Sequence, residues 1–182
     1  QLYILGDEKV LNDFSLAIIG CRDYTDYGKK IAKNLSFNLA KRGVSIISGM
    51  ARGIDTFAHI GCIVGGGKTI AVLGSGFNNI YPKENTELLK EIIDNGGAVI
   101  TEYEPDVKPL PDNFPKRNRI ISGLSNGVIV VEAAKKSGSL ITVDFALEQG
   151  KNIYAVPGNI NSTCSFATNE LIKEGAIPYT GI

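Results

Sequence analysis

The sequence predicts an α/β domain whose mostly parallel sheet is doubly wound between helices, a three-layer fold of the Rossmann-like class. Six short apolar runs recur along the 182 residues. They are continuous rather than alternating, which is typical of strands that helices cover on both faces. Most are separated by segments in which apolar residues return every three or four positions, the period of an amphipathic helix. This alternation of strand and helix predicts the fold class.

In chain order, the expected strands are the apolar runs at 16–20, 44–48, 69–74, 98–103, 127–133 and 152–158. The expected helices between them span 28–41, 55–64, 85–95 and 142–149. Four of the seven prolines fall within 104–115, so we expect an extended loop there. Beyond Pro157 the sequence predicts a loop, a short helix at about 166–174 and a final short strand.

Length and composition indicate one globular domain over 1–182. Hydrophobic residues make up 43% of the chain and charged residues 21%, as in ordinary globular proteins. Lysine plus arginine equals aspartate plus glutamate at 19 each, so an anionic partner must be met by a local patch rather than by a global basic excess. Because the chain starts with Gln1, we expect a fragment of a protein with flanking domains.

The three cysteines, Cys21, Cys62 and Cys164, are an odd number, lie far apart and form no CxxC pair. This pattern predicts free thiols in a reducing compartment and no zinc site. No stretch reaches the roughly 18–20 apolar residues of a membrane span, and the first residues do not resemble a signal peptide. We therefore expect a cytoplasmic protein that does not insert into a membrane.

The loops that follow the first, second, third and fifth expected strands combine glycine, small hydroxyl residues and basic side chains. In a doubly wound sheet these loops meet at one edge and open helices, whose free N–H groups attract anions. Arg22, Arg52 and Lys83 supply one positive charge in each of the first three loops. The pattern predicts a phosphate-binding edge. Plain turn chemistry is the alternative for any single loop, and Arg52 could simply pair with Asp55.

A second basic cluster lies just before the fifth expected strand, in the segment 114–125. Lys116, Arg117 and Arg119 fall within four positions, which indicates a local footprint for a phosphate backbone, with a solvated helix start as the alternative. Aromatic residues near the loops could stack on unpaired bases or belong to the core. They are Tyr24, Tyr27, Phe77, Tyr81 and Phe114.

No set of catalytic residues is visible in the sequence. The single histidine, His59, lies one helical turn after Asp55, where a buried structural hydrogen bond is a better explanation than catalysis. The chain has no GxxxxGKS, GxxxxGKT or HExxH motif and no carboxylate cluster for Mg²⁺. We therefore expect a binding protein without a cofactor or a metal ion, rather than an enzyme.

Several longer segments together resemble the DprA/Smf family of DNA-processing proteins: IIGCRDYTDYG, IISGMARGIDTFAHIG, GSGFNNIYPKEN, NFPKRNRIISGLSNGVIVVEAAKKSGSLIT and TNELIKEGA. The resemblance runs in order from Leu16 to Ile177. It implies an extended Rossmann domain that binds single-stranded DNA without strong sequence preference and protects it. It also implies loading of the recombinase RecA in natural transformation, and a homodimer.

The resemblance implies site residues as well. The implied DNA-binding positions are Gly20, Cys21, Arg22, Ser48, Gly49, Arg52, Gly53, Lys83, Asn85, Lys116, Arg117, Asn118, Arg119, Ser137, Gly138 and Ser139. The implied dimer or partner interface consists of Asn169, Leu171, Ile172 and Ile177. Cys21 departs from the family, which usually has Ser or Thr before the loop arginine, and a thiol is the poorer hydrogen-bond donor.

A nucleotide hydrolase that resembles the cytokinin-activating phosphoribohydrolases is the alternative function. That family has a PGGxGTxxE motif after a core strand. The comparable segment here, VVEAAKKSGSLIT, has serines on either side of Gly138 and no glutamate at the catalytic spacing. This departure counts against hydrolysis. The role of Glu132 stays open between a ligand contact and a capped core carboxylate.

Overall fold

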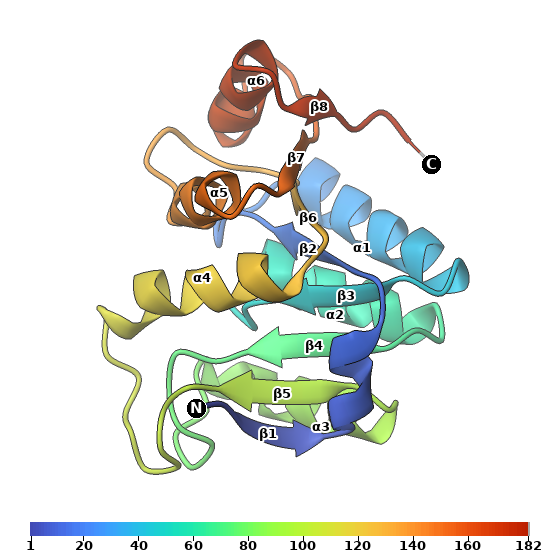
Figure 1. Ribbon diagram of the computed structural model, residues 1–182. Coiled ribbons are helices and arrows are strands. Elements are labelled where there is room, and N and C mark those ends of the chain that lie inside the picture. The colour runs from blue at the N-terminus through green and yellow to red at the C-terminus, as the bar shows by residue number, and fades with distance from the viewer. Residues whose placement is uncertain (182) are drawn as a thin grey trace.

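An eight-stranded sheet organises the computed structural model, which describes residues 1–181 (Figure 1). The strands lie in the order β1-β5-β4-β3-β2-β6-β7-β8. Their bounds are β1 Tyr3–Gly6, β2 Ser15–Ile19, β3 Ser45–Ser48, β4 Thr69–Val72, β5 Ala98–Thr101, β6 Gly127–Val130, β7 Asn152–Ala155 and β8 Ile177–Pro178. Strands β2 to β8 pair in parallel, and β1 runs antiparallel to β5. The predicted doubly wound, mostly parallel fold is confirmed.

Helices cover both faces of the sheet because the chain reverses its direction across it. The helices are α1 Asp26–Lys41, α2 Ile54–Val64, α3 Thr86–Asp94, α4 Asn113–Leu124, α5 Ser139–Glu148 and α6 Phe166–Lys173. From β2 the chain moves outward to β5, and from β6 it moves the opposite way to β8. Right-handed crossovers therefore place α1, α2 and α3 on one face and α4, α5 and α6 on the other. The reversal falls between the neighbouring strands β2 and β6.

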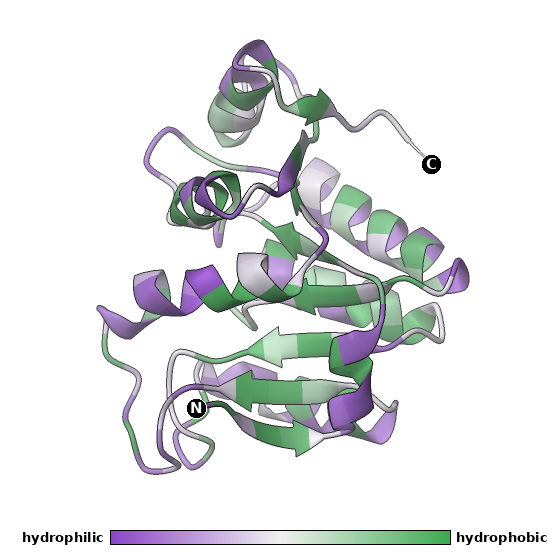
Figure 2. Ribbon diagram, in the orientation of Figure 1, coloured by the Kyte–Doolittle hydropathy of each residue, from purple (hydrophilic) through white to green (hydrophobic). Residues whose placement is uncertain are grey.

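The central strands are buried along their whole length, which explains their continuous apolar sequences. All residues of β3, β4, β5 and β6 are buried. Successive side chains face opposite layers, so Ile46 packs with α1 and α2, whereas Ile47 packs with the helices of the other face. Full burial of one such side chain stabilises the fold by about 1.5–3 kcal/mol. Figure 2 shows the hydrophobic colour concentrated along the sheet.

Two elements differ from the sequence prediction. The sequence does not predict β1, a half-exposed edge strand that forms by pairing with β5. Helix α4 begins at Asn113, inside the stretch expected to be extended. Pro115 fits there because it is the third helical residue, and N–H groups of a first turn have no partner within the helix.

The other predicted strands and helices are confirmed, with ends that differ by a few residues. They include α6 and the final strand β8. Within the part of the chain that the structure describes, no helix is both long and apolar enough to cross a membrane.

Candidate functional site

A cleft of about 860 Å³ opens at the carboxyl edge of the sheet, where β2 and β6 are paired. Its walls are the loop after β2, the loop after β6, the start of α4 and the 3-10 helix η3 (Thr163–Ser165). Doubly wound folds bind ligands in the crevice at such a reversal of strand order. The structure therefore brings together loops that lie more than a hundred residues apart in the sequence.

Arg22 stands on the wall of this cleft with an available guanidinium group. Its side chain is exposed and, among residues 1–181, it has no ion-pair partner. The guanidinium carbon lies 5.8 Å from the centre of the Phe114 ring, within the range of a cation–π contact. The positive charge at this point of the cleft is left for an external anion.

Arg52 and Lys83 continue the positive charge beyond Arg22. Arg22 and Arg52 line a smaller pocket together, and Lys83 follows Pro82 of that pocket at the start of the 3-10 helix η2 (Lys83–Asn85). Arg52 pairs with Glu84, and not with Asp55, and the bond holds the pKa of Glu84 below its ordinary value. We call Arg22, Arg52 and Lys83 the basic rim.

A buried polar layer, formed by Ser48, Asp55, Asn85 and Arg117, lies beneath the basic rim. Arg117 is only 4% exposed, and its Nη1 donates hydrogen bonds to the backbone oxygens of Gly49, at 2.7 Å, and of Val72. Asp55 Oδ2 accepts from the N–H of Gly49 at 3.1 Å. Burial raises the pKa of Asp55 to about 6, although the charge of Arg117 acts in the opposite direction. Arg117 thus ties α4 to the ends of β3 and β4.

Three of the implied DNA-binding residues have buried side chains that are bonded within the protein. Ser48 is fully buried, and its hydroxyl donates to the backbone oxygen of Ile18 at 2.6 Å. Asn85 is 6% exposed, and its amide donates to Met50 and Thr56. Arg117 is the third. These side chains hold the loops in place.

The other implied DNA-binding residues are distributed around the cleft. Those that line it, besides Arg22, are Gly20, Cys21, Asn118, Ser137, Gly138 and Ser139, and Gly49 lines the smaller pocket. Gly53 is buried at a φ of +81°, and a Cβ there would lie 2.5 Å from the backbone oxygen of Cys21. Glycine therefore lets the loops after β2 and β3 meet.

Lys116 and Arg119 are exposed on α4, outside the residues that line the cleft. Arg119 pairs with Glu102, so its charge already has a partner. Sequence reasoning missed Lys136, an exposed residue that does line the cleft. The sequence signal that could have identified it is the pair Lys135-Lys136, which stands in the loop after β6 just before Ser137.

Glu132 is a buried residue that packs against the N-terminus of α1. It is 1% exposed and accepts hydrogen bonds from both the backbone N–H of Thr25, at 3.0 Å, and the Thr25 hydroxyl. A Cβ on Gly28 would lie 2.1 Å from Glu132 Oε2, so the carboxylate packs directly against the first turn. The anion site expected at the N-terminus of this helix is therefore occupied by a side chain of the protein itself. Glu132 is a core carboxylate.

His59 has the structural role expected from the sequence. It is fully buried, and its Nδ1 lies 2.7 Å from the hydroxyl oxygen of Thr69. That hydroxyl donates to the backbone oxygen of Ile46, so Nδ1 carries the proton and donates. Nε2 has no partner among the described residues, and burial lowers the pKa of the ring to about 3. The neutral ring is part of the core.

Of the four residues implied for a dimer interface, two are engaged within the domain and two are partly or fully exposed. Asn169 makes two hydrogen bonds of 3.1 Å with the backbone of Gly158, and Leu171 packs against the core. Ile172 is partly exposed and Ile177, in β8, is exposed. Ile160 and Phe166 are further exposed apolar residues of this C-terminal part.

Known proteins share both the sequence and this fold. The family model described as DNA recombination-mediator protein A matches residues 1–182. Protein Smf of Escherichia coli K12 is 48% identical over 98% of this chain, which spans 48% of that protein.

Two solved structures are similar to this one. The X-ray structure of DNA processing protein A from Streptococcus pneumoniae superposes with a TM-score of 0.93 at 42% identity, covering 99% of this chain and 63% of that one. DNA processing protein A from Helicobacter pylori, whose structure concerns its single-stranded DNA binding mode, has a TM-score of 0.90 at 35% identity, covering 99% and 82%. The chain therefore belongs to the DNA recombination-mediator protein A family, the DprA/Smf family.

Proposed function

We propose that this domain binds single-stranded DNA without sequence preference, protects it and helps to load RecA onto it in natural transformation. The chain spans about half the length of the E. coli relative it matches, so this activity is proposed for the domain within a longer protein. One observation carries the proposal above all others. Arg22 presents an exposed charge at the strand-order reversal, and no other described residue neutralises it in an ion pair.

The electrostatics of the cleft favour a phosphate next to Arg22. Arg22 and the buried Arg117 lie close enough for the charge of Arg22 to reinforce the lowering of the Arg117 pKa that burial causes. Two neighbouring positive charges repel each other, and an anion between or above them relieves the repulsion. Lys83, next to Pro82 of the smaller pocket, and Lys136, which lines the cleft, add positive charge, which suits a polymer of phosphates rather than a single one.

Aromatic rings in the cleft favour single strands over duplex DNA. Phe114 and Tyr81 are half-buried, line the cleft and lie with ring centres 5.6 Å apart. Unpaired bases can stack on such rings, whereas the bases of a duplex are already stacked on each other. The proposed path therefore places phosphates on the basic rim and bases toward Phe114.

The position of Glu132 speaks against the nucleotide hydrolase alternative. That function needs a carboxylate that reaches the substrate, whereas Glu132 is buried and is not among the cleft-lining residues. Both of its oxygens accept hydrogen bonds from Thr25. The proposed role is therefore binding rather than hydrolysis, and we propose that it takes place in the cytoplasm together with RecA, as the family resemblance implies.

A second copy of the chain is the partner that we propose for the C-terminal face. Ile160, Phe166 and Ile177 are exposed there, and β8 is the last strand of the sheet. Exposed apolar side chains beside an open strand edge are suited to pairing between copies. Sedimentation equilibrium should show a homodimer that Ile177→Asp weakens, and a monomer at all concentrations would contradict this part.

Fluorescence anisotropy with labelled single-stranded and duplex oligonucleotides, at two salt concentrations, tests the DNA proposal. Wild-type protein should bind the single strand more tightly, and its affinity should fall steeply with salt. Arg22→Ala should weaken binding about tenfold for every sequence, because a phosphate contact carries no sequence information. Arg119→Ala is the matched control and should change affinity less than about twofold, since its charge is already paired. Equal binding of duplex, or normal binding by Arg22→Ala, would reject the proposed site.

A further inference from the structure

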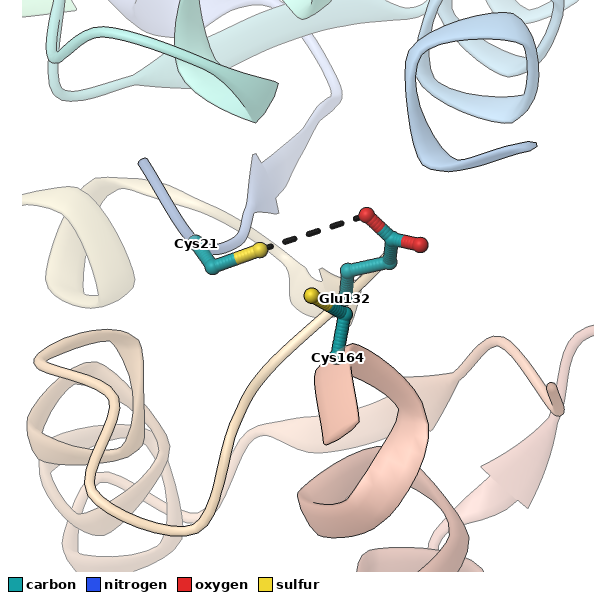
Figure 3. Close-up of side chains that lie close together, drawn as sticks. All are labelled: Cys21, Glu132 and Cys164. Carbon is teal, nitrogen blue, oxygen red and sulfur yellow. Dashed lines mark hydrogen bonds between the residues drawn. The ribbon is translucent and has the colours of Figure 1, made fainter. Parts of the chain in front are cut away.

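Two of the three thiols meet in space, although the sequence places them far apart. Cys21 follows β2, Cys164 lies in η3, and Glu132 follows β6. The two sulfur atoms and a carboxylate oxygen of Glu132 all lie within 4.8 Å of one another. Figure 3 shows the Cys21 sulfur turned toward the Glu132 carboxylate, with the Cys164 sulfur beside them. The distance from Cys21 Sγ to Glu132 Oε2 is 4.0 Å.

The two thiols are aimed at the same acceptor. Cys21 Sγ donates to the backbone oxygen of Asp23 at 3.0 Å, and Cys164 Sγ donates to the same oxygen at 3.4 Å. Both cysteines also line the cleft, so the cluster borders its open space. Convergence on one atom from two separate loops holds the sulfurs near each other without a bond between them.

The carboxylate is held in position before any ligand arrives. Thr25 donates to both oxygens of Glu132, and Gly28 leaves no room for the carboxylate to move toward α1. A carboxylate has about four lone-pair positions, so two hydrogen bonds leave others available. Outer hydrogen bonds of this kind orient the ligands of metal sites.

We propose that Cys21, Glu132 and Cys164 form a binding site for one Zn²⁺ ion, with a water molecule from the cleft as the fourth ligand. Two thiolates and a carboxylate are ligands that zinc prefers, and three protein ligands plus water complete its tetrahedron. With Zn–S bonds of about 2.3 Å, the two sulfurs of a tetrahedral site stand about 3.8 Å apart. The present spacing requires a shift of about 1 Å at most, within reach of side-chain rotation.

The charge balance of the site is unchanged by the ion. Binding of Zn²⁺ releases one proton from each thiol to solvent, because a coordinating thiol is deprotonated. The cluster carries one negative charge with neutral thiols and ionised Glu132, and it carries one negative charge again with the ion and two thiolates. Metal binding and DNA binding on the basic rim are therefore separable.

The two thiols are free, and their sulfurs share a hydrogen-bond acceptor and not a covalent bond. A divalent cation between them supplies the positive charge that stabilises both thiolates.

The test measures metal binding directly. The chain is stripped of metal with a chelator under reducing conditions, incubated with zinc chloride, desalted and analysed by atomic spectroscopy. We expect one zinc ion per chain, and Co²⁺ in its place should give the near-ultraviolet charge-transfer absorption of cobalt–thiolate bonds. Cys21→Ser and Cys164→Ser should each weaken zinc binding more than about 100-fold, beyond the loss caused by removing an outer partner.

Cys62→Ser is the matched control. Cys62 is fully buried, and its sulfur donates to the backbone oxygen of Lys68, away from the cluster. This variant should bind zinc as the wild type does, and circular dichroism of the metal-free proteins verifies that all three variants are folded. Absence of retained zinc and of the cobalt absorption would overturn the proposal. So would equal zinc binding by a Cys21→Ser/Cys164→Ser double variant, or a Cys21–Cys164 disulfide in protein purified without reductant.

Discussion

Two arginines on the same cleft, Arg22 and Arg117, differ in whether their guanidinium groups already have partners within the protein. Each guanidinium carbon lies 5.8 Å from the centre of the Phe114 ring, and both residues line the cleft. Arg117 is buried and bonded to two backbone oxygens, whereas Arg22 is exposed without an ion-pair partner in residues 1–181. A basic residue at the cleft therefore either ties the loops together or offers its charge to solvent, depending on whether internal acceptors reach it first.

The largest expected effect is the loss of stability on removing Arg117. Arg117→Ala leaves Asp55 buried without its opposing charge and frees two backbone acceptors, which should cost about 3–5 kcal/mol. Arg117→Lys should also be strongly destabilised, because one ammonium group cannot replace both the Nη1 bonds to the backbone and the Nε bond to Asn118. Urea unfolding measures both, and Arg119→Ala, at an exposed pair, should lose less than about 1 kcal/mol. A wild-type unfolding midpoint for Arg117→Lys would remove the distinction between the two arginines.

The second effect is a dependence of stability on pH that comes from the buried residues and not from the basic rim. Folded His59 stays neutral down to about pH 3, whereas an unfolded histidine binds its proton near pH 6.5. The unfolded state therefore takes up this proton first, and stability falls as the pH drops through that interval. Asp55 acts in the opposite sense between about pH 6 and 4, because its folded pKa is the higher one.

His59→Gln should separate the two contributions. Between pH 7 and 4 its free energy of unfolding should rise relative to that of the wild type by an amount on the order of 2 kcal/mol. Urea unfolding at three pH values checks this. Parallel pH profiles for the two proteins would mean that His59 is not held neutral in the fold.

The third effect comes from replacing Arg22 by lysine, which keeps the positive charge but not the shape of the guanidinium group. Arg22→Lys keeps the positive charge on the rim, so single-stranded DNA affinity should stay within about threefold of wild type, whereas Arg22→Ala loses about tenfold. Both variants should unfold within about 0.5 kcal/mol of wild type, since the exposed side chain holds nothing in place. Anisotropy titrations paired with urea unfolding test this. A large stability loss in Arg22→Ala would place Arg22 with the buried polar layer instead.

The smallest effect should come from Glu84→Gln. The change removes a negative charge from the rim and releases Arg52, which Glu84 and Tyr81 hold. Single-stranded DNA affinity should rise about twofold at low salt, and the gain should vanish at high salt because exposed charges are screened. Weaker binding by this variant would show that the pair positions Arg52 for DNA.

The sheet was predictable from sequence because its strands are covered on both faces, and two-sided burial leaves a continuous apolar run such as TIAV in β4. Strand β1 was not predictable, because a half-exposed edge strand does not require a continuous apolar run. The start of α4 was hidden by Pro115, which is compatible with either a loop or a first helical turn.

The residues of the cleft were predictable as a set but not in their roles. Glycine, serine and basic residues after strands indicate a shared edge, and half of the implied residues line the cleft there. Whether Arg117 faces solvent or the backbone of β4 depends on how α4 docks, which no local pattern records. In the same way, Cys21 and Cys164 meet only because two separate loops fold over β6.

The carboxylate of Glu132 at the head of α1 has a consequence for how the domain responds to its surroundings. In a protein whose helix terminus awaits a phosphate, occupancy and therefore stability follow the concentration of that ligand. Here the group at the helix terminus is a side chain of the same protein, Glu132, so the terminus is always occupied. The first turn of α1 is therefore insulated from changes in nucleotide or phosphate levels.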